Sequence, residues 1–284
     1  MSRLQLPQVH VPRSRHLVLF EQEFEGLNSF YWMYRSASAL MLQQSEKFAR
    51  TTDFLPQPEA SRLDISCGEI GVISTQADRV ARYGILVQVI TYYEVYLTGV
   101  LSDVVSTRWP GSRQVTVKFR PSDLPNGELN SYLKAASVAS EVASVIDESY
   151  SRRLARISNL LTSCGFPEPQ QSADRKMLVT AACEIRNCVV HNGGKVDHRT
   201  KDALESIFPA LAIGAQFELD EACLWKLLAA VRDDARAIDF AIRKQASEKR
   251  VSRSAKRRRA LARRKAENLA QMHARRGTNN TDEL

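Results

Sequence analysis

Side chains that can do chemistry are concentrated in one stretch, residues 183–194, which reads Cys-Glu-Ile-Arg-Asn-Cys-Val-Val-His-Asn-Gly-Gly. Its arginine can hold a phosphate group through a planar guanidinium, and its histidine can exchange a proton near neutral pH. On a regular helix Arg186 and His191 point about 140° apart, whereas Asn187 and His191 are stacked neighbours. Arg186 and His191 therefore share a site only if the helix end unwinds at the glycine pair, if the long arginine reaches round, or if a second copy of the chain supplies half of the groups.

The neighbouring residues predict the helix that must position this stretch. Ser172 offers an N-cap, and apolar residues recur at helical spacing from Leu178 to Val189. Gly193 and Gly194 then follow as helix-ending residues. We therefore expect Arg186, Asn187 and His191 to lie in the last turns of one helix.

This pattern resembles the motif of the HEPN superfamily, a group of helical bundles in which an arginine is followed, after four to six residues, by a histidine. Arg186 and His191 fit the four-residue form, and Asn187 stands where members commonly have asparagine. The apolar segment 92–97 with Glu94 embedded in it is similar to the helix that precedes the motif helix in members with this arrangement. The resemblance covers residues 74–246 and extends to a helix predicted over residues 16–50.

The resemblance implies a metal-independent RNA endonuclease that acts as a homodimer, with motif residues of both chains facing one cleft. Cleavage would proceed by attack of the ribose 2′-OH and leave 2′,3′-cyclic phosphate ends. His191 would move protons, Arg186 would hold the scissile phosphate, and Asn187 would orient either group. Glu94 would hold Arg186 in place or tune His191. Many such proteins act in host defence or as toxins, so an antitoxin or another regulatory protein is an expected partner.

Interpretations in which these residues are not catalytic stay open. An arginine and a histidine at this spacing also occur together by chance, and Glu94 can be a buried structural carboxylate paired with an arginine. The protein can also be a non-catalytic module whose cleft holds RNA or nucleotide, or an interaction subunit that pairs with another protein.

The sequence gives little support to metal or other cofactor chemistry. Asp197 and His198 follow His191, but no cysteine or histidine cluster has the spacing of a structural zinc site. The Gly193, Gly194, Lys195 run lacks the first glycine and the Ser or Thr of a phosphate-binding loop. The five cysteines form no CxxC pair and lie mainly between apolar neighbours, which is typical of reduced core thiols. We expect no metal and no cofactor.

Composition favours an all-α fold. The chain has 284 residues, of which 44% are hydrophobic and 25% charged, with only 12 glycines and 10 prolines. Helical patterns cover residues 16–50, 75–108, 128–163, 172–192 and a segment that opens at Asp220. Alternation over 111–127 predicts a short strand or an extended loop inserted over the bundle. We therefore expect one HEPN-like helical domain over residues 14–246, with its core at 74–246, followed by a basic extension over 247–284.

Positive charge is concentrated in that extension. The chain carries a formal charge of +8, but the segment 243–276 alone holds 14 Lys and Arg against two Glu, so residues 1–242 are slightly acidic. The extension has no aromatic residue to stack on bases and is expected to contact RNA phosphates, ordered or not before binding. The alternative is a solvated tail that only aids solubility. The cations expected to contact RNA are Lys256, Arg257, Arg258, Arg259, Arg263, Arg264 and Lys265.

No segment of the sequence predicts a membrane span or a secretory signal. The longest uncharged apolar run, residues 83–93, is shorter than the roughly 20 residues that a spanning helix needs. We expect a cytoplasmic protein without a membrane partner.

Overall fold

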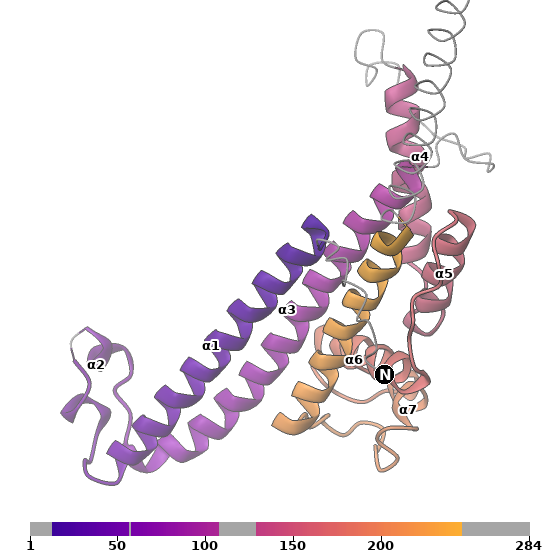
Figure 1. Ribbon diagram of the computed structural model, residues 1–284. Helices are drawn as coiled ribbons and strands as arrows, with labels where there is room; N and C mark the ends of the chain where they lie inside the picture. The colour runs from indigo at the N-terminus through magenta and orange to yellow at the C-terminus, as the bar shows by residue number, and fades with distance from the viewer. Residues whose placement is uncertain (1–12, 57, 108–128, 246–284) are drawn as a thin grey trace, which may run out of the picture.

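The computed structural model describes residues 13–56, 58–107 and 129–245, and this part of the chain is mostly helical (Figure 1). It holds no strand, only isolated bridges between Arg50 and Ser66 and between Lys195 and Gln216. The all-α prediction is confirmed for these residues. The predicted extended segment 111–127 and the basic extension 247–284, with all seven of its expected RNA-binding residues, lie outside them.

Two long helices, α1 (Arg15–Ser45) and α3 (Ile70–Ser106), run antiparallel side by side (Figure 1). His16 near the start of α1 pairs with Asp103 near the end of α3 at 3.0 Å, and Ser38 meets Ser74 at 2.6 Å. The apolar face of α1 is largely buried, and its Phe20 packs against Tyr93 and Tyr96 of α3. The α1–α3 hairpin thus forms the framework on which the other helices pack.

The boundaries of these two helices differ from the prediction. The helix predicted over 16–50 ends at Ser45, because Arg50 leaves the helix to pair with Asp64 at 2.8 Å and to bridge Ser66. The connection contains η1 (Thr51–Asp53), α2 (Glu59–Arg62) and η2 (Cys67–Glu69). A capping box between Ser66 and Glu69 starts η2, which continues directly into α3, so α3 begins at Ile70 rather than at Thr75.

The single helical pattern predicted from 128 to 163 is two helices, α4 (Leu129–Ile146) and α5 (Tyr150–Ser163). The break lies at Ser149, whose backbone is extended with ψ at 143°. The change of direction lets Tyr150 and Arg153 reach Glu94 on α3. Periodicity alone misses the break because no glycine or proline marks it.

The motif helix α6 (Ala173–Asn192) forms as predicted, with the Ser172 hydroxyl accepting from the Arg175 amide at 3.2 Å. It is followed by α7 (His198–Leu204), which the sequence pattern did not indicate and which Asp197 caps. A last helix covers residues 221–245 and is capped by Asp220, as expected. Its apolar stripe is buried against the hairpin and α6: Leu224, Leu228, Val231, Ala235 and Ile238.

Helix α3 is long and carries many apolar residues. With η2 before it, the span Cys67–Ser106 is long and apolar enough to cross a membrane, and half of its most apolar window is buried inside the molecule. Core helices of soluble proteins share these properties. The cytoplasmic localisation and the absence of a membrane partner stay predictions.

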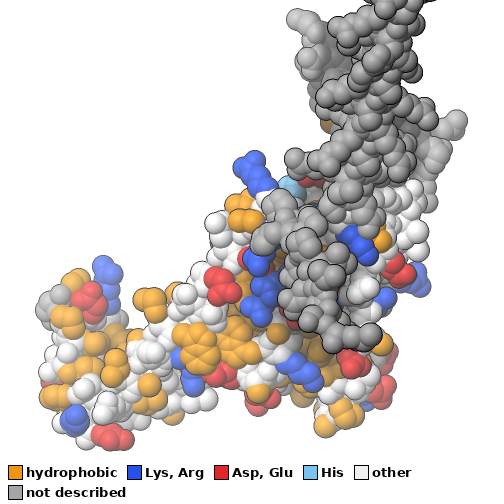
Figure 2. All heavy atoms as spheres, viewed as in Figure 1, with side chains coloured by type: hydrophobic (Ala, Val, Ile, Leu, Met, Phe, Trp, Pro, Cys, Tyr) orange, Lys and Arg blue, Asp and Glu red, His pale blue; other side chains and the backbone are white. Residues whose placement is uncertain are grey.

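Large apolar side chains are exposed where the hairpin extends beyond the other helices, and Figure 2 shows several of them over that part of the surface. Blue and red side chains are interspersed over the rest of the visible face. The most exposed apolar side chains of this region are Phe30, Met33, Leu40, Val72 and Val80.

Candidate functional site

The end of α6 is fixed by its glycine exit. Gly193 adopts a left-handed conformation with φ at 60°, which stops the helix, and the Gly194 amide donates to the Cys188 carbonyl at 3.0 Å. The Asn192 side chain donates to Asp197 at 2.8 Å, which ties the helix end to the cap of α7. The exit therefore gives the last turn, which carries His191, a defined direction.

Arg186 is held from two sides. Its Nη1 donates to the Asn187 side-chain oxygen at 3.0 Å, and its Nη2 lies 3.6 Å from Oε2 of Glu94 on α3. The second contact is an ion pair too long to be a hydrogen bond. Its Nε is buried and has no hydrogen-bond partner among the described residues. The guanidinium is thus oriented, and the N–H groups of Nη1 and Nη2 that these two contacts do not use can still donate to an anion.

Glu94 lies at the centre of a charged cluster, which we define as Glu94, Tyr150, Arg153 and Arg186. The Arg153 Nη1 and the Tyr150 hydroxyl both donate to Oε1 of Glu94, the former at 2.9 Å. The Arg153 guanidinium also stacks over the Tyr150 ring, 3.9 Å from its centroid. One carboxylate thus faces two guanidiniums, which leaves the cluster with an uncompensated positive charge.

The Tyr150 hydroxyl of the cluster does not lose its proton near neutral pH. Burial raises the pKa of the Tyr150 hydroxyl, and the neighbouring Cys183 and the hydrogen bond to Glu94 raise it further. The hydroxyl therefore stays protonated and serves to orient Glu94.

His191 lies apart from this cluster. Its side chain is exposed in the last turn of α6 and makes no hydrogen bond or ion pair with another described residue. Arg186 on the same helix is half-buried and turned toward α3. Of the expected site residues, the structure therefore brings Glu94, Arg186 and Asn187 together and leaves His191 separate, as the angular argument requires for one regular helix.

The cysteines of the motif helix are core thiols. Cys183 and Cys188 are both buried, and burial raises the pKa of each. The Cys188 thiol donates to the Lys195 carbonyl at 3.2 Å. A thiol that stays protonated in this way is a poor nucleophile.

Sequence reasoning missed Arg153 and Tyr150. A signal was present, because Tyr150 lies four residues before Leu154 and Arg153 lies four residues before Ile157. This spacing places both on the helix face that is directed toward the core. That signal did not tell which acid they would meet, since Glu94 lies 59 residues from Arg153 in the chain.

Within the described ranges, no group of three or more His, Cys, Asp or Glu side chains is arranged to hold a metal ion. Asp197 and His198 are the residues that the sequence offers as candidate metal ligands. Asp197 instead caps α7, because its side chain accepts from the Thr200 amide at 2.7 Å.

Three comparisons with known proteins give no match: no family model fits the chain, and neither the curated proteins nor the solved structures contain a similar one.

Proposed function

We propose that the protein is a metal-independent RNA endonuclease of the HEPN type that acts as a homodimer in host defence or toxin–antitoxin biology. The observation that carries this proposal is the charged cluster around Glu94. It orients Arg186, leaves N–H groups of Arg186 unpaired, and holds more positive than negative charge. Such an arrangement suits a phosphodiester, which is an anion with several acceptor oxygens.

The proposed chemistry divides the work between the two motif residues. His191 takes the proton from a ribose 2′-OH, the 2′-oxygen attacks phosphorus, and the bond to the 5′-oxygen breaks as that oxygen gains a proton. The products are a 2′,3′-cyclic phosphate and a free 5′-OH. Arg186 holds the phosphate and stabilises the charge that accumulates on its oxygens.

We infer a homodimer because one chain separates the two groups. A two-fold axis near the ends of the two α6 helices would bring His191 of one chain to Arg186 of the other. A non-catalytic module that binds RNA, or an interaction subunit, remains the alternative function, and the same separation of Arg186 from His191 favours it if no such dimer forms.

Cleavage of structured RNA in EDTA tests the proposal. Arg186→Ala and His191→Ala should each lower cleavage by about 100-fold or more, with helix content unchanged by circular dichroism. Arg152→Ala and His198→Ala are matched controls, because both residues are exposed and lie outside the proposed site. Full activity of His191→Ala, or products without cyclic phosphate ends, would falsify the assignment.

A mixed dimer tests the shared site. Chains carrying Arg186→Ala and chains carrying His191→Ala are each expected to be inactive alone. When the two are mixed, some dimers contain one complete site and cleavage should partly recover. A stable monomer by sedimentation that still cleaves RNA would contradict the dimer.

A further inference from the structure

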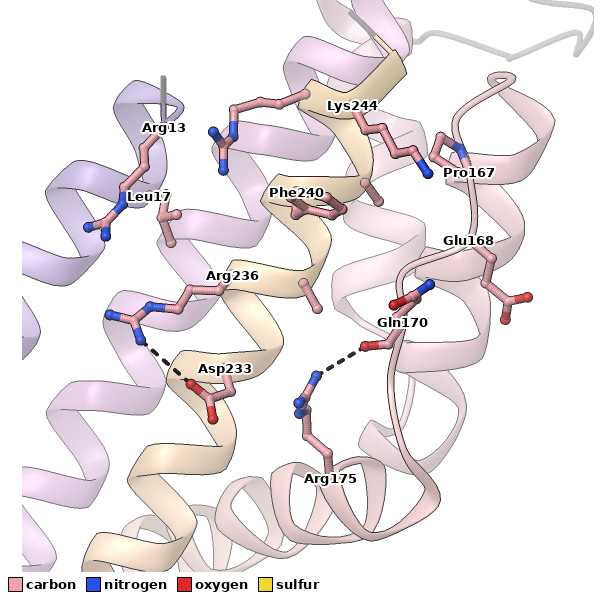
Figure 3. A pocket seen from close by; sticks show the side chains of 13 residues that line it. Arg13, Leu17, Pro167, Glu168, Gln170, Arg175, Asp233, Arg236, Phe240 and Lys244 are labelled. Carbon is pink, nitrogen blue, oxygen red and sulfur yellow. Dashed lines mark hydrogen bonds and ion pairs between the residues drawn. The ribbon is translucent and has the colours of Figure 1, made fainter. Parts of the chain in front are cut away.

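A cavity of about 490 Å³ lies between the helix over residues 221–245, the first turn of α1 and the segment that precedes α6 (Figure 3). Its volume falls within the range of about 300–1,000 Å³ that is typical of small-molecule sites. Arg175, which lines it, is 16 residues from His191 along α6, or about 24 Å at 1.5 Å per residue. The cavity is therefore distinct from the site proposed for cleavage.

One wall of the cavity is apolar and carries an exposed aromatic ring. Phe240 is 55% exposed, although its neighbours Asp239 and Ala241 are buried. Ala237 and Ala241 continue the wall on the same helix, and Pro167 lies on the facing segment (Figure 3). An aromatic ring that faces an open cavity can stack on a planar ligand, and a proline ring can cover the other face.

The remaining lining is cationic. Five arginine and lysine side chains line the cavity against two acids. Asp233 pairs with Arg236 at 3.7 Å and Arg243 pairs with Asp239, whereas Glu168 accepts only from the neutral Ser158 hydroxyl, at 3.0 Å. Glu21, outside the cavity, pairs with Arg13 and Arg236.

Arg175 is the cation best placed to hold an anion. One of its nitrogens donates to the Gln170 carbonyl at 3.0 Å, which fixes its direction at the base of the cavity (Figure 3). In the described part of the chain no carboxylate lies within ion-pair distance of its guanidinium. Lys244, one turn beyond Phe240 on the same helix face, extends over the upper rim toward Pro167 (Figure 3).

We propose that this cavity binds a nucleoside phosphate. The base stacks on Phe240 and is covered by Pro167, and the phosphate is held by Arg175 at the base of the cavity. The Gln170 side chain, which lines the cavity, offers both a donor and an acceptor for a base edge. A purely anionic ligand would make no use of the apolar wall, and a purely apolar ligand would leave Arg175 without an ion-pair partner.

Isothermal titration of the full-length protein with AMP, CMP, GMP and UMP tests this inference. At least one mononucleotide should bind saturably, with one site per chain. The matching nucleoside and inorganic phosphate should each bind at least about tenfold more weakly, because each lacks one half of the recognised group. Phosphate that binds as tightly as the mononucleotide would overturn the role of the aromatic wall.

Variants locate the site. Phe240→Ala and Arg175→Ala should each weaken mononucleotide binding by about tenfold or more. Phe30→Ala, which removes an equally exposed ring on α1, and Arg152→Ala on α5 should leave it unchanged. Absence of binding at about 1 mM ligand, or affinities unchanged by both cavity variants, would overturn the proposal.

A short oligoribonucleotide distinguishes the source of the ligand. If the oligonucleotide binds more tightly than its mononucleotide and both cavity variants weaken it, the cavity holds one nucleotide of a strand. If the two ligands bind alike, the cavity serves a free nucleotide. The readout is binding alone, so it does not depend on whether the protein cleaves RNA.

Discussion

Asp234 is the buried acid whose environment most affects its ionisation. It is fully buried on the helix over residues 221–245, and it accepts hydrogen bonds from the Tyr93 hydroxyl and the Gln171 amide, both at 2.5 Å. Burial raises its pKa to about 6, although these two hydrogen bonds and Arg175 act in the opposite direction. The residue thus links α3, the segment before α6 and the last helix through a carboxyl group that titrates in mildly acidic solution.

Stability should therefore fall as the pH rises through this range. Between about pH 4 and 6 the folded state holds the Asp234 proton that the unfolded state has lost, so the free energy of unfolding decreases, by roughly 3 kcal/mol at most. Asp234→Asn removes the titration and should flatten the decrease, as measured by urea unfolding at a series of pH values. Asp233→Asn, at the half-exposed neighbouring position, should retain it, and equal slopes in both variants would contradict the assignment.

The sequence pattern indicates Arg186, Asn187, His191 and Glu94 as side chains that could act together. In the structure Glu94, Arg186 and Asn187 meet and His191 does not. The sequence pattern could not identify Asp234. The pKa of its carboxyl group depends on burial and on hydrogen bonds from Tyr93 and Gln171, which lie 141 and 63 residues away in the chain. Side-chain type and local spacing are visible in a sequence, whereas a hydrogen bond between distant segments is not.

At the scale of elements, the exit of α6 rests on two glycines with different surroundings. Gly193→Ala should cost about 1 kcal/mol, since its φ of +60° disfavours a side chain but nothing lies within 4 Å of the added carbon. Gly194→Ala should cost about 2–3 kcal/mol, because the added carbon would also lie 2.2 Å from the Gln216 amide nitrogen. That nitrogen donates to the Gly193 carbonyl at 3.1 Å.

Urea unfolding of the two variants measures the difference. Equal costs at the two positions would show that Gln216 moves away freely and does not help to fix the helix end. The glycines themselves were predictable as helix-ending residues, but the bridge from Gln216 was not, since 23 residues separate it from Gly193.

The observed helix ends agree with the predicted ones where a capping residue or a glycine marks the boundary, and they differ elsewhere. Ser172, Asp220 and Gly193 all act as expected. The break at Ser149 has no such mark, and its reason is tertiary: α5 must turn for Tyr150 and Arg153 to reach Glu94. A local pattern cannot show a boundary that a distant carboxylate imposes.

In the whole molecule, positive charge is concentrated in residues 243–276, whereas residues 1–242 are slightly acidic. Truncation after Ala246 should leave a folded dimer that binds RNA less tightly at low salt, with a flatter dependence of log K on log salt. Contacts to phosphates far from the reacting bond change affinity without changing the chemical step, so KM should rise while kcat holds. Filter binding at several salt concentrations and initial rates on a short substrate measure both quantities.

The outcome decides between two functions of the extension. A salt dependence that truncation leaves unchanged would assign it to solubility. Loss of folding, or loss of cleavage at saturating RNA, would instead make it part of the bundle or of the site and move the domain boundary beyond residue 246.

The Trp32 and Trp225 rings stack across α1 and the last helix, 5.9 Å apart and within 8° of parallel. Two indoles this close can couple their strong far-ultraviolet transitions, so the protein should show a far-ultraviolet circular dichroism couplet that either substitution, Trp32→Phe or Trp225→Phe, removes. The signal requires both helices to be docked, whereas fluorescence intensity alone would also report Trp109. The chain thus carries an intrinsic optical reporter of helix docking that is independent of any ligand or label.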